Sequence, residues 1–124
     1  MAVQSLFYIN NIRRNEADYT IDFSIDANHE VFRGHFPDQP VVPGVCQVQL
    51  IREVLEEVLQ KPLVLHAANN MKFMNMIVPE KNPDLQLQLQ VKEEDELWKV
   101  KASITDGETI FLKFQGRFQE KKAI

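Results

Sequence analysis

The sequence contains a single cysteine, Cys46, and no CxxC motif or paired cysteine and histidine spacing. An internal disulfide is therefore excluded, and a zinc site is not expected. No apolar run comes near the roughly 20 residues that a membrane helix needs, and the first residues lack the charged-then-apolar order of a signal peptide. These absences predict a protein that binds no metal and resides in the cytoplasm.

A strong charge of either sign is also missing. The 124 residues include 14 basic and 18 acidic side chains, for a formal net charge of −4. Such a mild balance creates no chain-wide field toward nucleic acid or anionic lipid, so neither a nucleic acid nor a membrane is expected as a partner. The length and the hydrophobic share of 44% suit one globular domain over residues 1–124.

Hydrophobic periodicity predicts six extended segments and one helix. The extended segments are 5–13, 18–27, 63–79, 84–92, 96–104 and 108–118. After Gly44 the period becomes helical, and the helix ends after about four turns at Lys61-Pro62. Strands with one solvent-exposed face and one apolar face must bury the apolar face against another element. This helix is the candidate for that element. The predicted fold class is α+β, with a curved antiparallel sheet wrapped around one long helix.

The stretch "HEVFRGHFPDQPVVPGVCQVQL", residues 29–50, is rich in glycine, proline and histidine. It holds two of the four glycines, three of the six prolines and two of the three histidines. The prolines fix their own backbone angles and push the preceding residues toward extended geometry, which predicts a stiff loop. Pro43-Gly44 then opens the helix, and Gly44 lets another group approach backbone N–H donors that have no partner within the helix.

His35 lies nine residues before this helix start. The start of a helix attracts partial negative charge, such as a polarised carbonyl oxygen, and imidazole titrates near neutrality. Together these features predict a proton-transfer site at a carbonyl. The alternative is that His35 only caps a loop.

The pattern N-x-x-x-F-x-G-H-F-P-x-x-P-x-x-P-G-V resembles the β-hydroxyacyl-acyl-carrier-protein dehydratases. It is formed here by Asn28, Phe32, Gly34, His35, Phe36, Pro37, Pro40, Pro43, Gly44 and Val45. "NNMKFMNMIVP" and "ITDGETIFLKFQGRF" extend the resemblance more loosely, so that it covers nearly the full chain. The resemblance implies a hot-dog fold, a homodimer or a hexamer built from it, and no cofactor. It also implies a substrate carried as a thioester on acyl carrier protein or coenzyme A.

The resemblance also implies roles for individual residues. His35 takes an α-proton from a 3-hydroxyacyl thioester, the backbone N–H of Gly44 steadies the thioester carbonyl, and a carboxylate of the partner subunit protonates the departing hydroxyl. Phe36, Pro43, Val45, Met71 and Phe73 are expected to contact the substrate, although core packing explains Met71 and Phe73 equally well.

Gln49 stands where the family has its carboxylate. A carboxamide cannot shuttle a proton near pH 7, and losing a general acid typically slows a reaction by about 10²- to 10⁴-fold. Glu53 lies one turn farther along the same helix face and is a candidate replacement. The alternative is that Glu53 belongs to a solvated stripe with Glu56 and Gln60.

Three functions follow from this departure. The first is a 3-hydroxyacyl thioester dehydratase, a lyase of fatty acid or related lipid biosynthesis, with altered or reduced activity. The second is a hot-dog thioesterase in which Glu53 activates water or attacks the thioester. The third is a non-catalytic subunit that binds an acyl carrier and pairs with an acid-bearing hot-dog protein.

Overall fold

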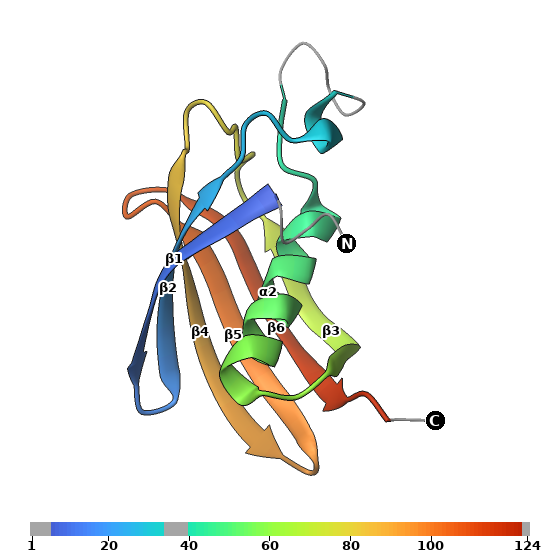
Figure 1. Ribbon diagram of the computed structural model, residues 1–124. Helices are drawn as coiled ribbons and strands as arrows, with labels where there is room; N and C mark the ends of the chain where they lie inside the picture. The colour runs from blue at the N-terminus through green and yellow to red at the C-terminus, as the bar shows by residue number, and fades with distance from the viewer. Residues whose placement is uncertain (1–5, 34–39, 123–124) are drawn as a thin grey trace.

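The computed structural model describes residues 6–33 and 40–122, and Figure 1 shows one curved sheet with a single long helix packed across its concave face. In chain order the elements are β1 (Phe7–Asn15), β2 (Asp18–Ile25), the 3₁₀ helix η1 (Glu30–Phe32), α2 (Gly44–Leu59), β3 (Leu63–Phe73), β4 (Asp84–Glu94), β5 (Leu97–Thr105) and β6 (Ile110–Glu120). The strand order is β1-β2-β4-β5-β6-β3, and all neighbours are antiparallel. The predicted wrapped-helix architecture is confirmed.

The core lies between α2 and the inner face of the sheet. Alternate residues of the strands point inward, as Ile21 and Phe23 do on β2, and the apolar side of α2 meets them with Ile51 and Leu55. All four side chains are almost completely buried. Because a helix stripe and a pleated face each bury only one side, the two together enclose a single core.

Turn residues set the ends of the elements. Gln60 takes a left-handed conformation with φ of 55° after the last turn of α2, and Pro62 follows, so the helix cannot continue. In the β5–β6 hairpin Gly107 has a φ of 101°, which favours glycine. One carboxylate oxygen of Asp106 accepts hydrogen bonds from the amides of Glu108 and Thr109 at 3.0 and 2.8 Å, and these bonds lower the Asp106 pKa.

The extended segment predicted at 63–79 is shorter in the structure. β3 ends at Phe73, and residues 74–79 leave the sheet to run toward the start of α2. The amide of Met74 still donates to the Phe111 carbonyl at 2.8 Å, but farther along it is the carbonyl of Ile77 that accepts from the amide of Val42 at 2.9 Å. Tertiary pairing with residues 40–43 therefore ends the strand where the sequence pattern continued.

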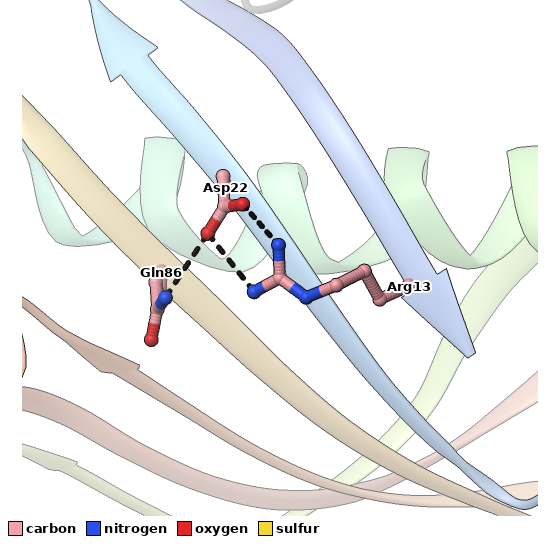
Figure 2. Close-up of polar contacts among 3 residues, drawn as sticks. All are labelled: Arg13, Asp22 and Gln86. Carbon is pink, nitrogen blue, oxygen red and sulfur yellow. Dashed lines mark hydrogen bonds and ion pairs between the residues drawn. The ribbon is translucent and has the colours of Figure 1, made fainter. Parts of the chain in front are cut away.

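The outer face of the sheet is polar. Figure 2 shows the Arg13 guanidinium of β1 bound to both carboxylate oxygens of Asp22 on β2, while the Gln86 amide of β4 donates to Asp22 at 3.0 Å. The hydrogen bond from Arg13 is the main reason why the pKa of Asp22 is lowered. In the described part of the chain, no helix is long and apolar enough to cross a membrane.

Candidate functional site at the start of α2

The first turn of α2 presents backbone donors that the helix itself cannot use. Pro43 is the N-cap residue, in extended conformation, and its side chain makes no capping hydrogen bond. Its carbonyl accepts from the amides of Cys46 and Gln47 at 3.1 and 3.3 Å. Within residues 6–33 and 40–122, no acceptor is bound to the amides of Gly44 and Val45. These two N–H groups are therefore available to an anion or a polarised carbonyl.

Gln47 holds the segment before the helix in place. The residue is buried, with 3% of its surface exposed, and its Nε2 donates to the Val42 carbonyl at 3.3 Å. The amide of Val42 is in turn bound to Ile77. Val42 is thus fixed on both sides, directly before Pro43, and the orientation of the free Gly44 amide is fixed with it. The side-chain oxygen, Oε1 of Gln47, is buried and has no hydrogen-bond partner among the residues that the structure describes.

The absence of a side chain at residue 44 leaves room for the ring of Phe73. A Cβ placed on Gly44 would lie 2.7 Å from Cζ of Phe73, closer than real Cβ contacts allow. Phe73 ends β3 and faces the helix side of the sheet, since its partner Leu112 on β6 is fully buried. A glycine is therefore favoured at residue 44, because the Phe73 ring approaches it closely.

An apolar surface surrounds the open amides. Val45 is 65% exposed on the helix, and Met71 and Phe73 are 43% and 48% exposed on β3. Met74 and Met76, which follow the strand, are also exposed, whereas Ile77 is completely buried in the core. In this chain Met71 and Phe73 are thus not core residues, and they form an apolar wall beside the start of α2. Pro43 is half-buried at its edge.

His35 and Phe36 lie outside the described residues, as does Gly34. Their predicted roles as base and substrate contact therefore stay predictions. Of the two histidines with described positions, His29 is the N-cap residue of η1, and its Nδ1 accepts from the amide of Val31 at 3.0 Å. That contact gives His29 a capping role. His66 is on β3, where it is exposed and its Nδ1 lies 3.1 Å from Oε1 of Gln119.

Gln49 and Glu53 lie on another side of α2. At 100° per residue they are about 140° and about 180° around the helix axis from Gly44. Glu53 lines a groove of about 310 Å³ against β1, together with Phe7, Ile9, Ile12, Leu50, Val54 and Glu57. Gly44 instead contacts β3, at the opposite edge of the sheet. In one chain, therefore, neither side chain is on the side of the helix that carries the Gly44–Phe73 contact.

Cys46 and Gln47 are buried residues in the first turn of α2. Cys46 is 8% exposed, and burial raises the pKa of its thiol, which opposes its use as a nucleophile. Cys46 therefore packs as a small apolar residue of the core. Gln47 was not singled out by the sequence pattern. The signal was present, since a glutamine that shares the apolar stripe with Leu50, Ile51 and Val54 must find a buried partner.

The sequence is similar to a known family of dehydratases. A family model described as the ApeI-like ApeI dehydratase matches residues 11–116. The 3-hydroxyacyl-[acyl-carrier-protein] dehydratase FabZ of Natranaerobius thermophilus is 34% identical over 92 residues, which cover 68% of this chain and 59% of the relative. FabZ of Anaeromyxobacter sp. is 29% identical over 99 residues, 70% of this chain and 62% of the relative. In FabZ of Clostridium acetobutylicum the match spans only 45% of the relative.

Several solved structures share this fold. A chain of the dehydratase heterocomplex ApeI:P from Xenorhabdus doucetiae superposes with a TM-score of 0.74 at 19% identity, covering 91% of this chain and 97% of that chain. The HP0420 homologue from Helicobacter felis superposes with a TM-score of 0.65 at 10% identity, covering 95% and 91%. These likenesses confirm the predicted hot-dog fold. Since the family model spans most of the sequence, the chain belongs to the ApeI-like dehydratase family.

Proposed function

We propose that this protein is a hydro-lyase subunit that dehydrates 3-hydroxyacyl thioesters carried on acyl carrier protein or coenzyme A. The observation that carries the proposal is the rigidly held start of α2, where the free amides of Gly44 and Val45 meet an exposed apolar wall. Thioester substrates need such a combination, because a carbonyl oxygen that gains negative charge sits next to an apolar acyl chain.

In the proposed reaction His35 removes a proton from the carbon next to the thioester carbonyl. The electron pair forms the carbon–carbon double bond while the 3-hydroxyl leaves as water with one added proton. The N–H of Gly44 donates a hydrogen bond to the carbonyl oxygen, whose negative charge grows during proton removal. The apolar side chains of Met71 and Phe73 contact the acyl chain and exclude water from it. This chain needs no cofactor for these steps.

The proton for the leaving hydroxyl comes from a second hot-dog subunit. Support comes from α2, because Gln49 and Glu53 are turned away from the Gly44–Phe73 contact of their own chain. Support also comes from β3, an edge strand that exposes Leu65, Met71 and Phe73 on its inner face. A second subunit that covers this edge would both bury the apolar side chains and bring its own helix to the site.

Two forms of the function differ in the identity of that subunit. In a homodimer the second helix supplies Gln49, or Glu53 as its replacement, and dehydration is slow. In a heteromer a different hot-dog chain supplies the carboxylate, and this chain supplies the base and the amide. The carboxamide at residue 49 favours the heteromer, and the structurally similar ApeI:P is itself described as a heterocomplex.

Hydration of a trans-2-enoyl thioester, the reverse reaction, tests the proposal. The purified chain is assayed alone, as His35→Ala, and together with acid-bearing hot-dog proteins from the same genome, while free thiol is measured in parallel. Hydration that depends on His35 supports the dehydratase, and hydration that begins only with the added protein supports the heteromer. Thiol release without hydration would instead establish a thioesterase. No hydration with any added protein, and none from Gln49→Glu, would refute the proposal.

A further inference from the structure

A second feature of the molecule is independent of the start of α2. The outer face of the sheet, opposite to the helix, carries a cluster that we call the basic trough. Its members come from four strands of the sheet: Lys72, Lys92, Lys99, Lys101, Lys113 and Arg117. All five lysines are exposed. They share this face because their strand neighbours, such as Ala102 on β5 and Phe114 on β6, are buried against the helix.

Several of these cations are direct cross-strand neighbours. Lys99 is paired in register with Lys92 on β4 and with Arg117 on β6, and Lys113 is paired with Lys72 on β3. Like charges directly opposite one another destabilise a sheet. The arrangement therefore lowers stability in the free chain, although the chain as a whole has a net charge of −4.

Acidic side chains do not compensate for this repulsion. Among the described residues, the ion pairs include only one member of the basic trough, Lys92, which lies 3.8 Å from Glu94. By contrast, Arg13 on the same face is held by both carboxylate oxygens of Asp22 (Figure 2). The sequence thus pairs a cation with an acid on one half of this face, whereas on the other half Lys92 alone has an acidic partner within the described residues.

The basic trough is hollowed. Two adjoining depressions of about 1010 and 730 Å³ share Gln90, Lys101 and Gln115 in their walls, so that Lys101 lies between them. Lys113 and Arg117 are four residues apart on β6, which places their backbone positions about 14 Å apart along the strand. A depression of this length accommodates a few residues of extended polypeptide.

We propose that the basic trough binds an acidic segment of a partner protein. The charge is complementary, and the glutamine amides in the walls can donate further hydrogen bonds to carboxylates. The limits of the cluster favour a short segment, because acids lie at its ends. Asp18 lines the β2 side of the larger depression, Asp22 follows on the same strand, and residues 93–96 are acidic at the end of β4 and in the β4–β5 turn. A DNA duplex or an anionic bilayer spans the whole face and meets all of these acids, whereas a peptide of a few residues can lie along Lys99, Lys101 and Lys113.

A fluorescein-labelled deca-glutamate peptide is the probe. We expect saturable binding by fluorescence anisotropy at about 50 mM salt that is largely lost at about 300 mM. The double variant Lys99→Glu and Lys101→Glu weakens binding at least about 10-fold, and Lys99→Gln with Lys101→Gln weakens it by less. The matched control, Lys81→Glu with Lys121→Glu, changes the net charge equally at exposed lysines outside the trough and alters binding by less than about twofold.

The same double variants report on repulsion in the free protein. Replacing Lys99 and Lys101 by glutamine removes like-charge pairs, so the urea midpoint rises while the peptide affinity falls. An equal loss of affinity in the control variant would overturn the proposal, because it would reflect overall charge alone. Absence of saturable peptide binding, or tighter binding of a short DNA duplex or of phosphatidylglycerol vesicles than of the peptide, would overturn it as well.

Discussion

The ring of Phe73 occupies the space that a side chain at Gly44 would need, since a Cβ there would lie 2.7 Å from the ring tip. Phe73 ends an edge strand and Gly44 begins the helix, so the contact joins the two elements that flank the candidate site. The glycine keeps the backbone amide accessible while the phenylalanine supplies the apolar wall beside it. This close contact therefore places the Gly44 amide and the apolar Phe73 ring side by side in the candidate site.

Under the proposed function, Gly44→Ala is expected to reduce turnover by at least about 10-fold. The methyl group displaces the half-exposed Phe73 ring and obstructs the approach to the amide. Stability should change by no more than about 1 kcal/mol, because alanine favours the helix and the ring can swing toward solvent. Steady-state kinetics and urea unfolding measure the two effects separately.

Phe73→Leu is the matched control, because it relieves the contact and keeps Gly44. It should raise KM for long acyl chains more than it lowers kcat, since it alters the wall and leaves the amide unchanged. Full turnover by Gly44→Ala would show that no substrate approaches this amide closely.

Gln49→Glu should increase hydration of an enoyl thioester by the chain alone, by about 10²- to 10⁴-fold. The change introduces a group that can donate a proton, at the position where the resemblance implies an acid. Progress curves at matched protein concentrations measure the gain, and Gln49→Met serves as a control of similar size without a proton to give. An unchanged rate would mean that residue 49 of a second copy does not reach the site.

Glu53→Gln separates the two interpretations of Glu53. If this carboxylate replaces the missing acid, its loss should reduce the activity of the chain alone about as much as His35→Ala does. Glu57→Gln is the control, because Glu57 lines the same groove against β1 one turn farther along α2. Equal and small effects of both substitutions would assign Glu53 to the groove and not to catalysis.

Gln47→Met should change the free energy of unfolding by no more than about 1 kcal/mol. The substitution loses the hydrogen bond to Val42, but it also removes a buried Oε1 that has no partner. Turnover should fall nonetheless, because Val42 is then held only through its amide and the chain before Gly44 is fixed less firmly. A much larger loss of stability, measured by urea unfolding, would contradict the absence of a partner for Oε1.

Asp22→Asn tests the ion pair with Arg13 through its pH dependence. The folded pKa of Asp22 lies below the ordinary value of 3.8, so its contribution to stability is present above that value and is lost as the pH falls through the folded pKa. The urea midpoint of Asp22→Asn should therefore be lower than that of the natural protein near pH 6, and the difference should disappear in acid. Asp18→Asn, on the same strand, is the control. A difference that persists at the acidic end would show that the ion pair is not its cause.

Local patterns in the sequence were sufficient for most of the fold. Alternation over the segments that became β4, β5 and β6 predicted a meander, and the change to a helical period predicted α2, because both periodicities are properties of the chain itself. The motif from Asn28 to Val45 likewise predicted the hot-dog fold and the open helix start at Gly44. The buried role of Gln47 was missed, since its partner Val42 is visible only once the loop and the helix are placed.

The sequence by itself determined the strands, the helix and the residue types of the site, because backbone sterics and side-chain polarity act over a few neighbouring positions. Tertiary structure alone decided that Phe73 meets Gly44, that β3 ends before Met74, and that Glu53 faces β1. It also gathered cations from four strands into one trough. Those outcomes depend on strand order and register, which bring together residues far apart in the chain and which no local pattern encodes.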